Sequence, residues 1–249
     1  SDERYAKNYL KGKYGAIPYI RNDMIHEIFK ANSGDWFVMG KKDFSRDSKT
    51  DTKEQLPIIL IVCEGERTEP NYFDQFEVTN ITIDPRGIGD NTVRLVEYAI
   101  KESKTNDYDQ VWCVFDKDSF PNQNFNRAVE LAKNENFGIA YSNESFELWY
   151  ILHFEFLNSQ ITRDQYIKKL NNIFKSKKDE GFPDSYEKKD PNIYRILKPY
   201  QHVALKNAKN LSKDYESELI PSSATQCPVT YVYKLVEELN KWIPSHRLD

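Results

Sequence analysis

"ILIVCEGERTEP", residues 59–70, begins as an apolar run and ends in three glutamates with an arginine among them. The continuous apolar run over residues 57–63 predicts a strand that is buried on both faces of a sheet. Glu64, Glu66 and Glu69 follow it within six positions. Like charges repel one another at the end of a buried strand, so this cluster needs a compensating partner.

The chain beyond residue 56 alternates between strand and helix patterns. Strands are predicted over 57–63, 78–83, 110–115 and 137–142, and helices over 71–77, 91–103, 124–135 and 144–154. Strands that alternate with helices are typical of a parallel sheet covered on both faces. The sequence therefore predicts an α/β fold with a mainly parallel sheet flanked by helices.

Three regions differ in composition. Residues 1–55 are polar and broken and are interpreted as an N-terminal extension or linker of uncertain structure. Residues 56–158 form the predicted core. Residues 159–249 form a lysine-rich, helical C-terminal region, with helices predicted over 162–178, 200–215 and 227–242, the last one starting at Pro228.

The composition excludes several classes of protein. The chain has 249 residues, of which 39% are hydrophobic and 30% charged, and it contains no apolar run long enough for a membrane span, so a soluble, cytoplasmic protein is expected. Three scattered cysteines and the lack of zinc-ligand spacing argue against a disulfide framework and a zinc site. Because the net charge is −4, a nucleic acid would have to meet a local basic patch.

Acidic side chains follow two of the predicted strands. Glu64 comes directly after the first strand, and Asp116 and Asp118 come after the strand over 110–115. The carboxyl ends of parallel strands meet at one edge of a sheet, where the ligand crevice of α/β proteins lies. Asp116 and Asp118 are two residues apart, so in an extended segment both carboxylates face one side. Oxygen ligands of this kind suit Mg²⁺.

Three motifs together resemble a known family. They are "ILIVCEGERTEPNYF", "VWCVFDKDSF" and "YSNESFELWYILHF", in this order, and the closing "PVTYVYKLVEEL" adds to them. They resemble the RloB-like family, whose core is similar to the Toprim fold of primases, topoisomerases and overcoming-lysogenization-defect nucleases. The resemblance covers residues 56–158 and implies a Toprim-like core.

The resemblance implies a carboxylate site for Mg²⁺ or Mn²⁺ that acts on phosphodiesters. Glu64 corresponds to the Toprim glutamate, Asp116 and Asp118 to the D-x-D aspartates, and Glu69 to the second glutamate of the related nucleases. RloB-like proteins are associated with prokaryotic antiphage defence, often beside an ATPase. The implied function is a metal-dependent nuclease controlled by a partner ATPase, with RNA, such as tRNA, or DNA as substrate. The alternative is a catalytically silent scaffold subunit of a defence complex.

Several residues near the motifs have two interpretations. Glu69 is a metal ligand or a first-turn acid that stabilises the dipole of a helix capped by Thr68. Arg67 contacts a phosphate or pairs with Glu64 or Glu69. Further candidates are Glu147, an acid among aromatic residues; Ser142, which with Asn143 also fits a helix cap; and His153, a general base or a core histidine.

Lysines of the C-terminal region supply the predicted basic patch. Lys168, Lys169, Lys177 and Lys178 are the candidates for phosphate contacts, with Tyr194 and Tyr200 as neighbours for base stacking. The alternative is an ordinary solvated helix face. The sequence leaves the oligomeric state open, and a homo-oligomer is one arrangement compatible with it.

Overall fold

A four-stranded parallel sheet forms the centre of the protein. The computed structural model describes residues 56–118, 121–216 and 222–244, so the predicted extension over residues 1–55 lies outside it. All described residues belong to one compact unit, Glu54–Asp249. The spatial order of the sheet is β2-β1-β3-β4, with bounds Thr82–Gly87, Ile58–Cys63, Gln110–Val114 and Gly138–Ile139.

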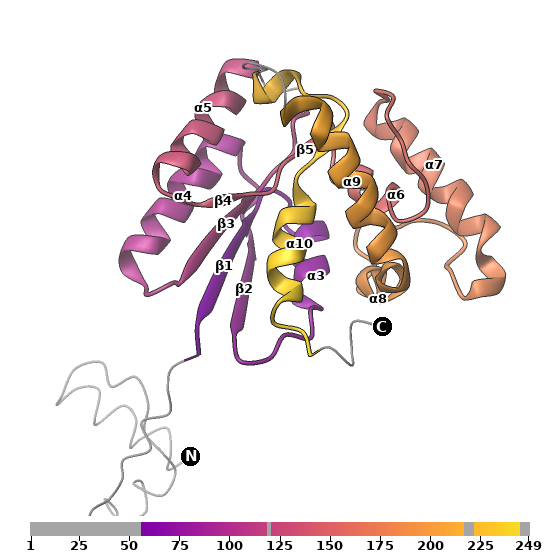
Figure 1. Ribbon diagram of the computed structural model, residues 1–249, viewed down its shortest axis with the longest axis horizontal. Helices are drawn as coiled ribbons and strands as arrows, with labels where there is room; N and C mark the ends of the chain where they lie inside the picture. Colours follow the sequence, from indigo (N-terminus) through magenta and orange to yellow (C-terminus); the bar gives the residue numbers. More distant parts are fainter. Residues whose placement is uncertain (1–55, 119–120, 217–221, 245–249) are drawn as a thin grey trace, which may run out of the picture. The chain divides into compact units, whose positions relative to one another are not determined.

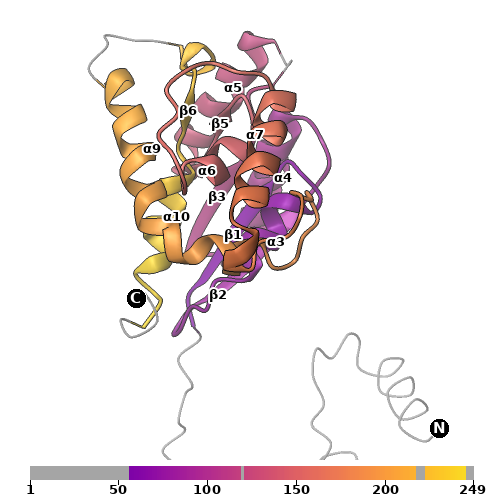
Figure 2. The same ribbon diagram turned by 90° about the vertical axis from the view of Figure 1, so that its right-hand side faces the viewer.

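Helices cover both faces of this sheet, as Figure 1 shows. One face carries α4 (Thr92–Thr105) and α5 (Asn122–Asn134), and the other carries α3 (Thr68–Asp74) and α10 (Val232–Asn240). Beyond α3 and α10 lie α6, α7, α8 and α9, which the turned view separates (Figure 2), with bounds Glu147–Ile151, Arg163–Ser176, Ile193–Leu197 and Gln201–Glu216. Short 3-10 helices cover Lys178–Glu180, Lys198–Tyr200 and Ser223–Thr225.

This arrangement confirms the predicted α/β class with a helical C-terminal region, and it is consistent with a Toprim-like core. In the described part of the chain, no helix is both long enough and apolar enough to cross a membrane.

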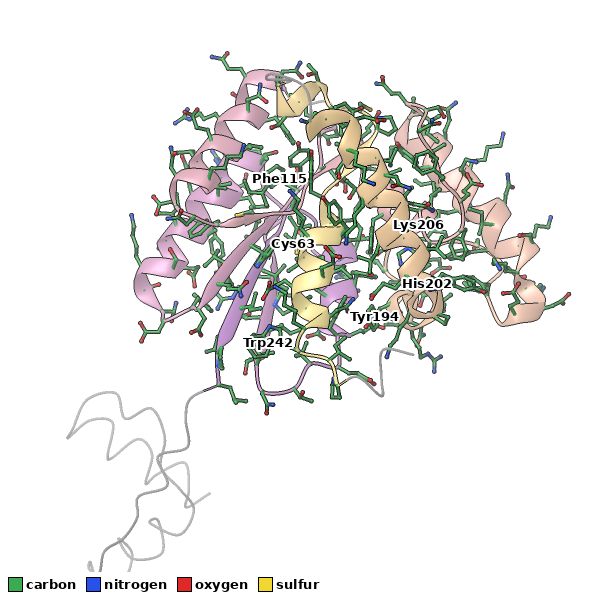
Figure 3. The ribbon with its side chains drawn as sticks, viewed as in Figure 1. Cys63, Phe115, Tyr194, His202, Lys206 and Trp242 are labelled. Carbon is green, nitrogen blue, oxygen red and sulfur yellow. The ribbon has the colours of Figure 1, made fainter. Side chains whose placement is uncertain are left out.

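The β1 strand is apolar throughout because its two faces serve two different hydrophobic clusters. Leu60 and Val62 pack toward α4 and α5, whereas Ile59 and Ile61 pack toward α3 and the C-terminal helices. The cluster around Ile59 and Ile61 contains residues from the predicted core, which ends at position 158, and from the C-terminal region. The C-terminal helices therefore share a core with the sheet. Figure 3 shows the contrast between the interior Cys63 and the exposed His202 and Lys206 on α9.

The connections that leave β1 and β3 run to opposite faces of the sheet. The chain passes from β1 through α3 to β2 on one face, and from β3 through α5 to β4 on the other (Figure 1). Because β1 and β3 are neighbours, a crevice opens between their carboxyl ends, where α/β proteins bind ligands.

The predicted strand over 78–83 was placed too early in the chain. The actual strand β2 begins at Thr82 and continues through Pro85 to Gly87. Proline lacks a backbone donor and is tolerated because β2 lies at the edge of the sheet. Its half-exposed residues carry little apolar pattern, which explains the misplacement.

Two further predictions near the chain's second half were wrong. The strand predicted over 137–142 splits into β4 and β5 (Ser142–Asn143), and β5 pairs antiparallel with β6 (Val229–Thr230). Pro228 therefore precedes a strand, and α10 begins only at Val232. Pairing between residues so far apart in sequence leaves no local signal.

Aromatic rings gather around Tyr72 on the α3 side of the sheet. Its ring lies 5.3–5.8 Å, centroid to centroid, from those of Phe73, Phe76, Phe146, Tyr150 and Tyr194. The hydroxyl of Tyr72 accepts a hydrogen bond from Trp149 Nε1 at 2.9 Å, and both side chains are fully buried. This bond joins α3 to α6 and so connects the motif that carries Glu69 to the motif that carries Glu147.

Replacing Tyr72 with phenylalanine is expected to lower the free energy of unfolding by about 1–3 kcal/mol, because the buried indole N–H loses its acceptor. Urea denaturation measures this. Tyr166→Phe is the matched control, since Tyr166 is equally buried and its hydroxyl has no hydrogen-bond partner within the described residues. Equal effects of the two substitutions would contradict the assigned role of the Tyr72 bond.

Candidate functional site

The acids that follow β1 and β3 meet at the carboxyl edge of the sheet. The backbone N–H of Glu64 donates to the Val114 carbonyl at 2.9 Å, which continues the pairing of the two strands beyond their ends. The backbone N–H of Asp116 donates in turn to Glu64 Oε2 at 3.0 Å. The side chain of Glu64 is thereby fixed across the end of β3, beside Asp116.

The turn after β1 brings Glu69 to the same place. Glu69 lies in the first turn of α3 and is 6% exposed. Its carboxylate occupies the space beside Gly65, where a Cβ atom would lie 2.1 Å from Glu69 Oε2. Glycine is therefore required at position 65 for this approach. Glu69 Oε2 is buried and has no hydrogen-bond partner among the described residues.

These side chains line a cavity of about 270 Å³. Its acidic lining comes from Glu64, Glu69, Asp116, Asp118 and Glu147. The remaining wall is formed by Gly65, Thr68, Phe146, Arg163 and Lys188. The structure thus brings all four predicted metal ligands, and the further candidate Glu147, to one cavity.

Two cations from the C-terminal region face these acids. Arg163, the first residue of α7, donates from Nη2 to Asp116 Oδ2 at 2.8 Å. Lys188 lies on the loop between α7 and α8, and its Nζ is 3.8 Å from Glu147 Oε1. Tyr186 on the same loop donates its hydroxyl to Glu147 Oε1 at 3.2 Å. Residues of the C-terminal region therefore complete the cavity.

The Thr68 hydroxyl holds this loop in place. It donates to the Lys188 carbonyl at 3.0 Å instead of capping α3. The prediction that Thr68 caps the helix is wrong, because α3 begins at Thr68 and the preceding Arg67 makes no side-chain cap. Arg67 is exposed and does not line the cavity, and no ion pair between described residues joins it to Glu64 or Glu69.

Burial in the cavity makes the acids reluctant to ionise. It raises the pKa of Glu64 from its ordinary value of 4.5 to about 7, with Asp118 and Glu69 adding repulsion. Burial likewise raises the pKa of Glu69, and Glu147 raises it further. The pKa of Asp116 rises because of burial and of Glu69 and Glu147, although Arg163 opposes the change. The cavity is short of positive charge.

Ser142 and Asn143 support the site without lining it. Ser142 is fully buried, and its hydroxyl lies 2.8 Å from Thr230 Oγ1. Asn143 donates its side-chain amide to the Ala224 carbonyl at 3.2 Å. Both residues belong to β5, so the prediction that they cap the next helix is wrong. The Ser142 carbonyl accepts from the Lys117 N–H at 2.7 Å and so holds the segment that carries Asp116 and Asp118.

His153 lies in the core, away from the cavity. It is 1% exposed, its Nδ1 is 2.9 Å from the Trp149 carbonyl, and its ring packs edge-on against Trp149. Burial lowers its pKa to about 4, so the imidazole stays neutral. This placement agrees with the core-histidine interpretation.

The predicted basic patch is partly neutralised by neighbouring acids. Lys168 is exposed on α7, but Lys169 pairs with Glu155 at 2.5 Å and Lys178 with Asp184 at 2.6 Å. Lys177 pairs with Glu180 at 2.9 Å, and its Nζ lies 4.8 Å from the centre of the Tyr200 ring and 5.8 Å from those of Phe154 and Phe182. Tyr194 is buried in the core, which removes it from base stacking. Nucleic-acid contact by these lysines stays a prediction.

The cavity has the ligand chemistry that a divalent cation needs, but its carboxylates do not converge on one point. The donor set is carboxylate oxygen, and Glu69, whose buried Oε2 has no partner among the described residues, belongs to the lining. Across residues 56–118, 121–216 and 222–244, no three acidic, histidine or cysteine side chains converge on one point. Binding an ion therefore requires side-chain rotation, and Arg163 competes for Asp116 Oδ2 if that oxygen is used.

In a comparison with protein-family models, the model described as RloB-like protein matches residues 59–239, which is more than half of the chain. The chain belongs to the RloB-like family. Searches of curated proteins and of solved structures each found no match. The matched range includes α7 and the loop that carries Lys188, so the two cations of this RloB-like protein lie within the family region.

Arg163 was missed by sequence reasoning. It stands one residue after the α7 cap, Thr162, and nothing in the sequence around it differs from an ordinary basic helix start. Lys188 is one lysine among many in the C-terminal region. Because both reach the cavity only through tertiary packing, no spacing rule would have selected them.

In EDTA, the free energy of unfolding is expected to fall as the pH rises from about 4.5 to about 7. The folded-state pKa values of Glu64, Glu69 and Asp116 lie above their unfolded values, so the native state holds more protons in that window. These three acids outweigh the opposite contribution of His153. Glu64→Gln should flatten the fall by up to about 3 kcal/mol. Urea denaturation across this range measures it.

Glu66→Gln is the control for this experiment, because Glu66 lies two residues away, is exposed and does not line the cavity. Glu66→Gln should retain the wild-type pH dependence. A Glu64→Gln profile as steep as that of the wild type would show that Glu64 does not titrate in the folded protein as described.

Proposed function

We propose that this RloB-like protein is a metal-dependent nuclease that hydrolyses phosphodiesters. The observation that carries the proposal is the single cavity in which acids from the ends of β1, β3 and α3 face Arg163 and Lys188. A phosphodiester is an anion, so a cavity lined by acids alone would repel it. A cavity that combines metal-binding oxygens with cationic donors suits phosphate chemistry.

Glu64, Asp116 and Asp118, joined by Glu69, are the residues that would hold Mg²⁺ or Mn²⁺. A divalent cation bound there lowers the pKa of a water molecule and neutralises charge that develops on the phosphate. The family and the donor chemistry support this assignment. The cavity sits at the carboxyl ends of β1 and β3, where α/β proteins place ligands.

The protein's own cations orient the substrate in this proposal. The Arg163 guanidinium presents several N–H donors in one plane, which match the oxygens of a phosphate. The Lys188 ammonium lies on the same cavity wall, positioned by the Thr68 hydroxyl through its backbone carbonyl. Glu147, held by Tyr186, keeps the Lys188 side chain turned toward the acids.

The biological setting belongs to the same proposal. We infer an effector of prokaryotic antiphage defence that acts on RNA, such as tRNA, or on DNA, and that a partner ATPase controls. The chain carries no G-x-x-x-x-G-K-[ST] motif, so coupling to nucleotide hydrolysis would need another protein. Co-expression with a neighbouring ATPase, followed by cleavage assays with and without it, tests this control.

One observation favours a second candidate function, that of a non-cleaving scaffold subunit. Arg163 forms an ion pair with Asp116, and no three potential metal ligands converge within the described residues. A protein that never bound metal would have this geometry permanently. Cleavage of any nucleic acid that requires Mg²⁺ or Mn²⁺ and stops in EDTA would exclude the scaffold role.

Glu64→Gln and Asp116→Asn are each expected to lower metal-dependent cleavage by at least about 100-fold, since loss of a residue that merely supports a metal ligand already costs 10–100-fold. The melting temperature of Glu64→Gln should stay level or rise, because this substitution removes a charge from a repelling group without breaking an ion pair. Cleavage assays against tRNA, single-stranded DNA and duplex DNA, with Mg²⁺, Mn²⁺ or EDTA, measure the activity.

Glu66→Gln is again the matched control and should cleave like the wild type, because Glu66 is exposed and does not line the cavity. Full Mg²⁺-dependent cleavage by either Glu64→Gln or Asp116→Asn would show that the metal assignment is wrong. Cleavage by the wild type that persists in EDTA would remove the metal from the proposal altogether.

A further inference from the structure

Arg163 is placed at the cavity by the start of α7. Thr162 and Gln165 form a reciprocal cap: the Thr162 hydroxyl accepts from the Gln165 N–H at 3.4 Å, and the Gln165 side chain accepts from the Thr162 N–H at 2.8 Å. The cap fixes the backbone on either side of Arg163. A change in the position of the guanidinium therefore requires rotation of the Arg163 side chain and no movement of the backbone.

The contact of Arg163 with Asp116 is incomplete. Nη2 donates to Asp116 Oδ2, whereas the buried Nε has no hydrogen-bond partner within the described residues. The side chain as a whole is 36% exposed. An ion pair built only for stability would also satisfy the buried Nε, because unpaired polar groups in the interior are costly.

A second unpartnered atom of opposite character belongs to a side chain that lines the cavity. Glu69 Oε2 is a buried acceptor, and Arg163 Nε is a buried donor, and neither has a partner among the described residues. Both belong to side chains that line the same cavity. Once side-chain rotation exposes them to the cavity, a metal ion together with a phosphate group would satisfy both atoms.

Charge balance makes Arg163 a competitor for the metal position. Five carboxylates and two cationic side chains line the cavity, so the acids outnumber the cations. Arg163 donates to Asp116, which is also a proposed metal ligand. The guanidinium and a divalent cation carry like charge and repel each other when both contact the Asp116 carboxylate. A bound cation therefore favours release of Arg163.

We propose that Arg163 is an exchangeable counterion of the metal site and an anchor for the substrate phosphate. In the metal-free protein it holds Asp116 and offsets the repulsion among the acids. A divalent cation takes its place, and the released guanidinium then donates to a phosphate oxygen of the nucleic acid. This inference rests on the proposed function, because it assigns the phosphate-binding residue of the same site.

The first test measures metal affinity in the absence of substrate. Mn²⁺ is titrated into the full chain and into Arg163→Gln by calorimetry. Removal of a charge-assisted contact that competes for Asp116 should tighten Mn²⁺ binding by about tenfold. Arg127→Gln is the matched control, because Arg127 is exposed on α5 and does not line the cavity, and it should bind Mn²⁺ like the wild type.

The second test measures substrate affinity. The protein is titrated into a labelled single-stranded oligonucleotide, with RNA and DNA tested separately. The buffer contains Ca²⁺ in place of Mn²⁺, and a gel checks that the strand stays intact. Arg163→Gln should bind it about tenfold more weakly despite its tighter metal binding. Arg163→Lys keeps the charge but not the planar fork, so its metal affinity should stay near that of the wild type while its oligonucleotide affinity falls.

Tighter Mn²⁺ binding together with weaker oligonucleotide binding by Arg163→Gln supports the proposal that Arg163 passes from Asp116 to the phosphate. Equal or weaker Mn²⁺ binding by Arg163→Gln, or unchanged oligonucleotide binding, would overturn it. If Arg163→Gln fails to fold, unchanged oligonucleotide affinity in Arg163→Lys overturns it as well. Cleavage by the wild type is measured separately. If the wild type cleaves no nucleic acid, the nuclease proposal fails, but the metal titration still tests whether Arg163 competes with the metal. If the wild type does cleave, the proposed role of Arg163 can still fail on its own.

Discussion

Repulsion among buried carboxylates at the end of the sheet is the constraint on which the site depends. Parallel pairing of β1 and β3 brings Glu64 beside Asp116, and the turn at Gly65 adds Glu69. Burial then raises the pKa of each of these acids. Such a group is stable only with countercharge from elsewhere, because charge removed from water must be paired.

That countercharge comes from the C-terminal region, which is therefore part of the site. The start of α7 supplies Arg163, and the loop before α8 supplies Lys188 and Tyr186. The same region shares a hydrophobic cluster with β1 and α3, so its helices pack on the same core as the sheet. In the proposed function a divalent cation would be the second source of countercharge, and it would compete with Arg163 for Asp116.

Much of this arrangement could be predicted from the sequence, for identifiable reasons. The buried strands β1 and β3 are continuous apolar runs, so the acids after them had to meet at one edge. Glu69 and Glu147 were found through motif resemblance. Arg163 and Lys188 were missed because they reach the cavity through packing of helices distant in sequence. The edge strand β2 was misplaced because Pro85 and its half-exposed neighbours carry no apolar pattern, and the pairing of β5 with β6 has no local signal.

The central claim is that the acid cavity binds a divalent cation between the ends of β1 and β3. Anomalous X-ray diffraction from crystals soaked in Mn²⁺ tests it most directly, since it locates the ion itself. The account predicts an anomalous peak among Glu64, Asp116 and Asp118, within reach of Glu69, with the Arg163 guanidinium turned away from Asp116. A cavity without a peak at saturating Mn²⁺, or an ion bound there while Arg163 still donates to Asp116 Oδ2, would contradict it.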